Sequence, residues 1–167
     1  MAGVEEITGC IPRLRRYARA LTGDRALADD LVQDTLERAW GRLHMWRKGS
    51  DLRAWLFSIM HNLYVNQTIA RHAQASVALD EVLELPVPAT QEERLVIREL
   101  VAALGRLPVE QREVVLLVGL EQVSYQEVAK VLGIPLGTVM SRLSRGRERL
   151  RALMSDRTSP PQLKVIK

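Results

Sequence analysis

Apolar residues recur at spacings of three and four along most of this 167-residue chain, and no stretch alternates apolar and polar residues as a half-buried strand would. This periodicity predicts an all-α protein. The clearest apolar stripe follows Asp24, where a helix is expected to bury one face and to expose its charged residues on the other. The side chains expected on the buried face are Leu27, Ala28, Leu31, Val32, Thr35, Leu36, Ala39 and Trp40.

Helix ends are marked by capping residues. Pro12 stands at a plausible first helical position, so we expect a helix from there to Thr22-Gly23. Asp24 and Asp51 are expected to cap the second and third helices. Later in the chain, two capping boxes begin at Thr90 and Ser124, because each is followed three residues on by glutamate.

The periodicity fails between Ala73 and Ala89, where acidic residues and two prolines replace it. We therefore expect two small helical domains joined by a flexible acidic linker. The predicted parts are a first domain, a linker, a second domain ending in a helix-turn-helix, and a flexible tail, at residues 1–74, 75–90, 91–153 and 154–167.

Several classes of protein are excluded by composition. One cysteine and three histidines offer neither an internal disulfide nor a metal-binding spacing, and no cofactor is expected. No apolar run approaches the ~18 residues of a membrane span, and the N-terminus lacks the layout of a signal peptide, so a cytoplasmic location is expected. No carboxylate pair, activated nucleophile or glycine-rich phosphate loop indicates an enzyme.

The strongest motif lies between Ser124 and Leu150. A short capped helix is predicted to end at Gly133-Ile134-Pro135, where glycine can adopt the left-handed conformation, and a second helix follows. Ile134 and Val139 would fill the angle between the two helices. This arrangement predicts a helix-turn-helix that places its second helix in the major groove of DNA.

Arginine outnumbers lysine by 20 to 4, and residues 131–167 carry eight basic and two acidic groups. Arginine binds phosphates and guanine edges through its planar fork. The predicted contacts to an upstream DNA element are Thr138, Ser141, Arg142, Arg145 and Arg149, with Lys130, Arg147 and Arg151 on phosphates. The alternative is a basic face that only contacts solvent.

The run from Ser124 to Arg147, with its entry Leu107 to Val114, resembles the promoter-binding domain of bacterial extracytoplasmic-function sigma factors. Residues 28–40 and 54–62 are similar to the polymerase-binding and promoter-melting regions of the same family. The resemblance covers about residues 10–74 and 91–153. It implies a non-catalytic subunit that binds core RNA polymerase, recognises promoter DNA and helps to open it.

The resemblance implies that the second helix docks on the clamp helices of the polymerase. The residues expected there are Asp29, Asp30, Gln33, Asp34 and Glu37, which form a mostly acidic face. An ordinary solvated helix face is the alternative. The following loop and the third helix would open the minus-ten element and hold an unpaired base, through Trp46, Arg47, Lys48, Ser50, Asn62 and Arg71. Trp55 is expected in the core instead.

Two features depart from the family pattern. The basic run that usually follows Asn62 is reduced to Arg71 and His72, and Gly146 replaces the common alanine, which indicates a close helix contact. By resemblance, an anti-sigma factor is also expected to hold the protein inactive. Two other readings stay open: a dimeric helix-turn-helix regulator, and a sigma-factor mimic, which should have lost the arginine face.

Overall fold

The computed structural model describes residues 2–72 and 90–158. All regular structure in these residues is helical, as predicted. The first module, residues 2–72, contains α1 (Ala2–Thr22), α2 (Arg25–Gly41), the short 3₁₀ turn η1 (Leu43–Met45) and α3 (Leu52–His72). The second module, residues 90–158, contains α4 (Gln91–Arg106), α5 (Val109–Val115), the π-helical turn η2 (Leu116–Leu120), α6 (Tyr125–Leu132) and α7 (Leu136–Thr158). The predicted acidic linker lies outside the described residues, except for Thr90.

The capping residues behave as the sequence predicts. Asp24 Oδ1 accepts from the amide of Leu27 at 3.0 Å, and Asp51 Oδ1 accepts from Ala54 N–H at 3.2 Å. Thr90 forms a complete capping box, because its hydroxyl accepts from Glu93 N–H and the Glu93 carboxylate accepts from Thr90 N–H. These contacts satisfy amides that a helix N-terminus leaves without partners.

The predicted start of the first helix is wrong. Helix α1 begins at Ala2 and continues through Pro12, although proline removes one backbone hydrogen bond and costs about 3 kcal/mol inside a helix. Burial of Ile7 before the proline and of Leu14 after it attaches both halves of α1 to the core. Tertiary packing therefore compensates for the helix breaker.

Helix α7 passes the boundary predicted at residue 153 and ends at Thr158, so the first part of the predicted flexible tail is helical. Leu150 and Leu153 pack against the core from one face of α7, immediately before this extension. Residues 159–167 of the predicted tail lie outside the described residues.

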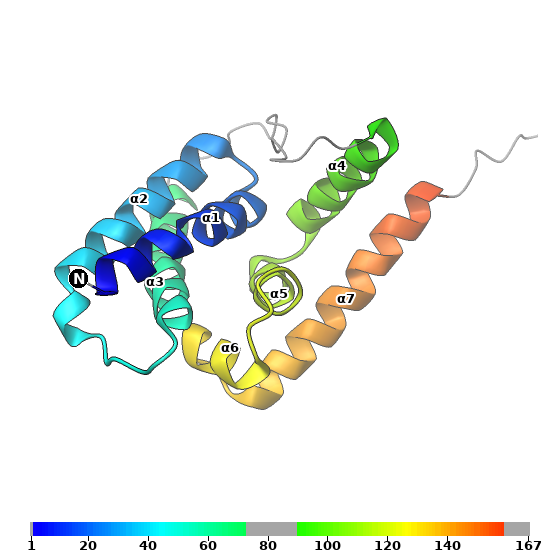
Figure 1. Ribbon diagram of the computed structural model, residues 1–167. Helices are drawn as coiled ribbons and strands as arrows, with labels where there is room; N and C mark the ends of the chain where they lie inside the picture. The colour runs from blue at the N-terminus through cyan, green and yellow to red at the C-terminus, as the bar shows by residue number, and fades with distance from the viewer. Residues whose placement is uncertain (1, 73–89, 159–167) are drawn as a thin grey trace, which may run out of the picture.

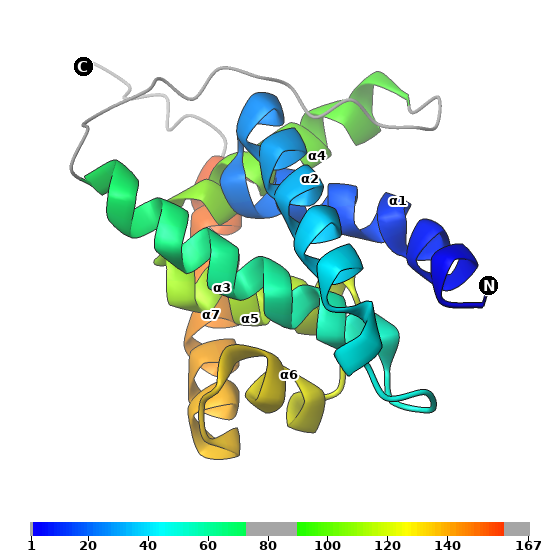
Figure 2. The same cartoon turned by 90° about the vertical axis from the view of Figure 1, so that its left-hand side faces the viewer.

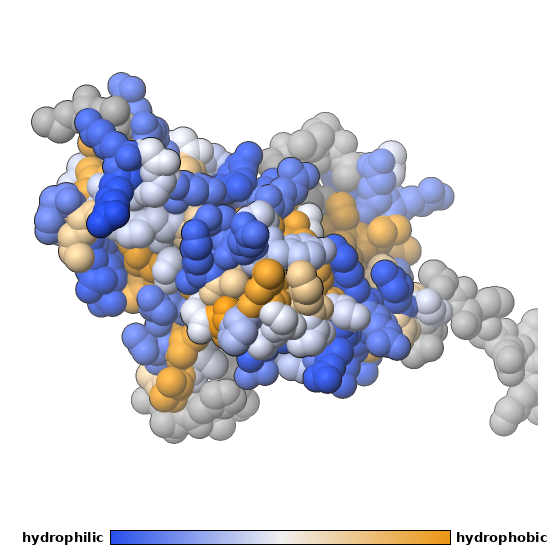
Figure 3. Space-filling view, turned by 90° about the horizontal axis from the view of Figure 1, so that it is seen from below, coloured by the Kyte–Doolittle hydropathy of each residue, from blue (hydrophilic) through white to orange (hydrophobic). Residues whose placement is uncertain are grey.

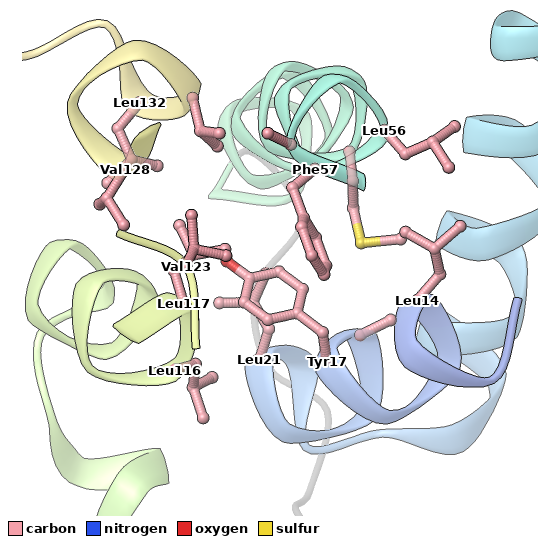
Figure 4. Close-up of a cluster of buried hydrophobic side chains, with 14 of the residues drawn as sticks. Leu14, Tyr17, Leu21, Leu56, Phe57, Leu116, Leu117, Val123, Val128 and Leu132 are labelled. Carbon is pink, nitrogen blue, oxygen red and sulfur yellow. The ribbon is translucent and has the colours of Figure 1, made fainter. Parts of the chain in front are cut away.

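The two modules lie side by side, with α5 between the first module and α7 (Figure 1). Helix α6 packs against α3, and both views place these helices next to each other (Figure 2). Buried apolar residues from both modules form one continuous cluster (Figure 4). In this conformation the described parts of the two modules share one core, instead of the two separate cores that the sequence suggests.

Candidate functional sites

The helix-turn-helix is formed by α6 and α7. Ser124 Oγ accepts from Glu127 N–H at 3.2 Å and begins α6, and Gly133 ends it in the left-handed conformation with φ 64°. Ile134 N–H then donates to the Ala129 carbonyl at 3.0 Å. Val139 is fully buried, and Ile134 is half-buried and packs against the core. The turn is thus built by local hydrogen bonds and a small apolar plug, as predicted.

The predicted DNA-binding side chains lie along α7 and α6. Ser141, Arg145, Arg147, Arg149 and Arg151 are exposed, Thr138 and Arg142 are half-buried, and Lys130 is exposed on α6. Within residues 2–72 and 90–158, none of the five α7 arginines from Arg142 to Arg151 forms an ion pair. Lys130 Nζ lies 3.5 Å from Glu127 Oε1, and an exposed ion pair of this kind contributes little to stability. These arginines are therefore available to bind an anion.

Sequence reasoning missed two apolar residues at the start of α7. Leu136 and Met140 are exposed, and Met140 is 48% exposed although it adjoins buried Val139. Apolar side chains in the major groove contact the methyl group of thymine. The signal was present in the sequence, since both residues lie off the buried stripe of Val139 and Leu143. Figure 3 views the side that carries α6 and the start of α7, and it shows an apolar patch bordered by hydrophilic residues.

The predicted polymerase-binding residues divide into two rows on α2. Asp29, Gln33 and Glu37 line an open groove of about 760 Å³ between α1 and α2. Asp30 and Asp34 lie outside this groove, and Asp34 Oδ2 accepts from Gln67 Nε2 of α3 at 3.0 Å. Asp34 thus links two helices and is only half-exposed.

Two predictions about α2 were wrong in part: the burial of Trp40 and the mostly acidic character of its surroundings. Trp40 was expected in the core but is 56% exposed and lines the groove, together with Leu36. Three arginines also line it, Arg15 and Arg19 from α1 and Arg25 from α2. The groove therefore combines both charge signs with an aromatic side chain, and only the α2 wall is mainly acidic.

The predicted promoter-melting residues do not form one cluster. Arg47, Lys48 and Ser50 are exposed in the loop before α3, where Ser50 Oγ donates to the Arg47 carbonyl at 2.7 Å and Gly49 has φ 96°. Asn62 is exposed on α3, about 15 Å further along the helix axis at 1.5 Å per residue. The side chain of Arg71 lies outside the described residues.

Trp46 lies in the loop between η1 and α3, but its side chain is half-buried instead of exposed. Its ring packs against the core cluster, and its Nε1 is buried without a hydrogen-bond partner among the described residues. Trp55 also packs against the core, as expected. Because the side chain of Trp46 is only half-buried, part of it is accessible to a base.

Two side chains have shifted pKa values. Burial raises the pKa of the Cys10 thiol, an effect that the nearby Arg13 and Arg53 partly oppose. The neutral thiol is a poor nucleophile. Burial also raises the pKa of Tyr17 well above its usual range, and the negative charge of Glu113 adds to the shift. Among the described residues, no group of three or more potential ligands could hold a metal ion, and no helix is long and apolar enough to cross a membrane.

A helix-turn-helix whose arginines form no ion pair with other described residues, packed on a second helical module, is typical of a DNA-binding protein. Comparison with known proteins gives its family. The family model described as the sigma2 domain of PhyR matches residues 7–61, and the model described as Sigma-70, region 4 matches residues 97–150. The chain is 38% identical to the ECF RNA polymerase sigma factor EcfG of Rhodopseudomonas palustris over 151 residues, 90% of this chain and 83% of that protein.

Solved structures agree with this match. The sigma factor RpoE of Bartonella quintana, in complex with the anti-sigma factor NepR, superimposes with a TM-score of 0.79 at 34% identity, covering 90% of this chain and 95% of RpoE. CnrH, in complex with the cytosolic domain of CnrY, gives a TM-score of 0.69 at 28% identity, covering 95% of this chain and 90% of CnrH.

The chain belongs to the extracytoplasmic-function RNA polymerase sigma factors of the sigma-70 family. It acts in transcription initiation, and its region 4 helix-turn-helix binds DNA. Sigma factors bind core RNA polymerase and are not enzymes. This membership disfavours the dimeric regulator that the sequence left open.

Proposed function

We propose that this sigma factor recognises its promoter through two surfaces and binds core polymerase through a third. Residues 1–74 bind core polymerase and the minus-ten element, residues 91–153 bind the minus-thirty-five element, and residues 75–90 join them. The observation that carries the proposal is the arginine face of α7, whose side chains lack ion-pair partners within the described residues. The same face argues against a sigma-factor mimic, which would not need it.

In the upstream contact, Thr138, Ser141, Arg142 and Arg145 read base edges, because the N-terminal part of a recognition helix enters the major groove. Arg147, Arg151 and Lys130 bind phosphates, and Arg149 lies on the recognition-helix face with Arg142 and Arg145. Exposed Leu136 and Met140 add apolar contacts to thymine methyl groups. Base contacts determine sequence preference, whereas phosphate contacts determine position on the duplex.

In the downstream contact, Arg47, Lys48, Ser50 and Arg71 bind the backbone of the opened strand, and Asn62 bonds to the edge of an unpaired base. Trp46, whose side chain is half-buried, contributes stacking to that base. The 15 Å or so between the loop and Asn62 implies contacts to more than one nucleotide.

Polymerase docks on α2 through Asp29, Asp30, Gln33 and Glu37, with Asp34 as a link to α3. Charge reversal at Asp30 tests this assignment, because Asp30 is exposed and forms no ion pair with another described residue. Asp30→Lys should reduce co-purification with core polymerase several-fold. The matched control is Glu5→Lys, an equal charge change at an exposed site on α1. Equal co-purification of both variants would refute docking at Asp30.

A bacterial cytoplasmic location and control by an anti-sigma factor complete the proposal. The support is that RpoE and CnrH, at 34% and 28% identity, were solved in complex with NepR and with CnrY. Co-purification from the native bacterium with antibody to this chain tests both partners. If core polymerase is recovered but no small protein co-purifies in stoichiometric amount, control by an anti-sigma factor is refuted and polymerase binding still stands.

Dependence on polymerase separates a sigma factor from a self-sufficient regulator. Each DNA-binding surface is small, and polymerase must fix the distance between them. The isolated chain should bind promoter duplex weakly and with strong salt dependence, and core polymerase should make binding tight and sequence-specific. Tight, specific binding by the chain alone would refute the proposal.

A further inference from the structure

The C-terminal half of α3 carries exposed apolar side chains. Ile69 is 68% exposed, more than any other large apolar side chain among residues 2–72 and 90–158, and Val65 is 38% exposed. Asn62 and Asn66 are exposed beside them. Counted from Asn62, the other three residues lie three, four and seven positions along the helix, so all four share one edge of it. This edge, formed by Asn62, Val65, Asn66 and Ile69, is the α3 strip.

Contacts on the other sides of α3 hold the strip outward. Gln67 Nε2 donates to Asp34 Oδ2 of α2 at 3.0 Å, and Leu63 and Tyr64 pack against the core. In Figure 2 this half of α3 extends past α2 to the edge of the molecule. Packing of the first module therefore fixes which edge of α3 faces outward.

The α3 strip carries no charge. Between Arg53 and Arg71 the sequence contains no lysine, arginine, aspartate or glutamate, and its one histidine, His61, faces α5. Within residues 2–72 and 90–158, the side-chain amides of Asn62 and Asn66 form no hydrogen bond. The recognition helix α7, by contrast, contains six arginines. The strip therefore lacks the cations that bind phosphates, and it offers amides and apolar groups instead.

The major-groove edge of an A·T pair matches this combination. Adenine presents an acceptor at N7 and a donor at N6, and an asparagine amide can bind both at once. Thymine presents a methyl group, which apolar side chains contact. A G·C pair has no methyl group at the corresponding position. Amides alternating with aliphatic side chains therefore complement A·T pairs better than G·C pairs.

The length of the strip fits a short run of base pairs. From Asn62 to Ile69 the helix rises about 10 Å, which corresponds to about three base pairs at 3.4 Å per pair. The major groove, about 12 Å wide, admits an α-helix. The strip also adjoins residues to which the proposed function assigns minus-ten contacts, since Asn62 belongs to it and Arg71 follows it on the same helix.

The order of the chain indicates which side of the opened stretch the strip contacts, an argument that rests on the proposed function. Asn62 bonds to an unpaired base, and the chain continues from the end of α3 toward the second module. That module binds the upstream element. Residues that follow Asn62 along α3 therefore lie on the upstream side of the opened stretch, where the DNA is still paired.

We propose that Val65, Asn66 and Ile69 select A·T pairs in the duplex that adjoins the opened minus-ten stretch on its upstream side. Val65 and Ile69 contact thymine methyl groups, and Asn66 bonds to the edge of adenine. Because the strip supplies no cation, it contributes to sequence preference and little to the salt dependence of binding. The two DNA-binding helices thus differ in chemistry: α7 uses arginines, and α3 uses apolar contacts and an amide.

Removing the methyl group of thymine tests the apolar contact without changing the protein. Holoenzyme assembled from core polymerase and the full chain first selects promoter fragments from the genome of the native bacterium, and the most tightly bound fragment becomes the template. Uracil then replaces thymine at one position at a time in the pairs upstream of the opened stretch. At a contacted position, binding should weaken about fourfold, the effect of leaving one methyl group in water.

Ile69→Ala tests whether Ile69 is the side chain that contacts the methyl group. The variant should weaken binding several-fold on the thymine template, and uracil at the contacted position should then have no further effect. The matched control is Leu95→Ala on α4, because Leu95 is exposed to a similar degree, at 57%. The control should keep the full effect of uracil. Both side chains are exposed, so both variants should fold, which circular dichroism checks.

Ile69→Lys tests the same position by adding a charge. A lysine close to DNA should steepen the dependence of log affinity on log salt concentration by about one and should abolish the effect of uracil. A lysine that faces only solvent would leave this slope unchanged. Asn66→Ala tests the amide, because it should remove the effect of replacing one adenine by 7-deazaadenine, which lacks the N7 acceptor.

The outcomes distinguish the strip from the proposed function. If holoenzyme selects and opens promoters but uracil weakens binding equally with the unsubstituted chain and Ile69→Ala, or has no effect at any position, the strip is overturned and minus-ten binding stands. Selected promoters without A·T pairs beside the opened stretch, or an unchanged salt slope in Ile69→Lys, overturn it as well. So does loss of a co-purifying protein in Ile69→Ala with unchanged promoter binding, since the ligand is then a protein. Failure of the holoenzyme to select any promoter would overturn both proposals.

Discussion

Gly146 in α7 is the point at which a single methyl group should disturb the fold most clearly. A Cβ atom added there would lie 2.7 Å from Val115 Cγ2 and 3.4 Å from Gln111 Cβ, both in α5. Val115 is β-branched and has one favoured side-chain rotamer in a helix, so it cannot move away easily. The sequence predicted a close helix contact at Gly146, and this distance confirms it.

Two effects of opposite sign decide the result of Gly146→Ala. Overpacking costs about 1–3 kcal/mol, and alanine gains about 1 kcal/mol of helix propensity over glycine. We expect a net loss of about 1 kcal/mol in the free energy of unfolding. For a chain of this length, that loss lowers Tm by about 2–4 °C. Thermal unfolding followed by circular dichroism measures it.

Gly9→Ala in α1 is the matched control, because its added Cβ has no atom within 4 Å. The control should gain about 1 kcal/mol, so the two alanine variants should differ by about 2 kcal/mol. In a Val115→Ala background the clash disappears and Gly146→Ala should become stabilising. Stabilisation by Gly146→Ala alone would refute the close-contact argument.

Three further predictions concern DNA binding, strand opening and pH. Alanine at Arg142 or Arg145 should cost about 1–3 kcal/mol of DNA-binding free energy and relax the base preference at one upstream position. Arg151→Ala should weaken binding to all sequences equally and reduce the salt slope by about one. Binding of the polymerase complex to cognate and scrambled upstream elements tests this division, and equal effects of all three variants would contradict it. Asn62→Ala should leave closed-complex binding nearly unchanged but slow strand opening, and a promoter with a pre-formed mismatched bubble should restore opening. Permanganate reactivity of the bubble region measures opening on both promoters. An equal loss of reactivity on both would argue against a contact to the unpaired base. The raised pKa of buried Tyr17 stabilises the fold fully below pH ~10, and this contribution is lost as pH rises from there toward the folded-state pKa, at up to about 1.4 kcal/mol per pH unit. Tyr17→Phe should lack this component in urea titrations between pH 8 and 11, and identical pH profiles would exclude it.

Local features of this protein were readable from the sequence. The helices, their caps at Asp24, Asp51, Thr90 and Ser124, and the turn at Gly133 depend on residues within four or five positions of one another. The helix-turn-helix was predictable for the same reason, as were the exposed arginines on α7. Spacing in the chain is sufficient information when the interacting groups are neighbours in the chain.

The surface of α2 could not be predicted from helical periodicity alone. A helical stripe indicates which residues share a face, but not how far a neighbouring helix covers that face. Trp40 follows the stripe of Leu36 and Ala39, yet α1 does not cover it, and it lies exposed in a groove. Asp34 shares its polar face with Asp30, but Gln67 from α3 engages only Asp34.

By itself, the sequence determined an all-helical chain, its helix-turn-helix and the side chains that can face DNA, because these follow from helical period and local capping. Only the tertiary structure decided that α1 continues through Pro12, that η2 is π-helical and that both modules share one core. Arg16 and Glu121 are 105 residues apart, and no periodicity relates them. Their pairing arises from the mutual burial of two apolar faces, which brings a cation and a carboxylate together far from each other in the chain.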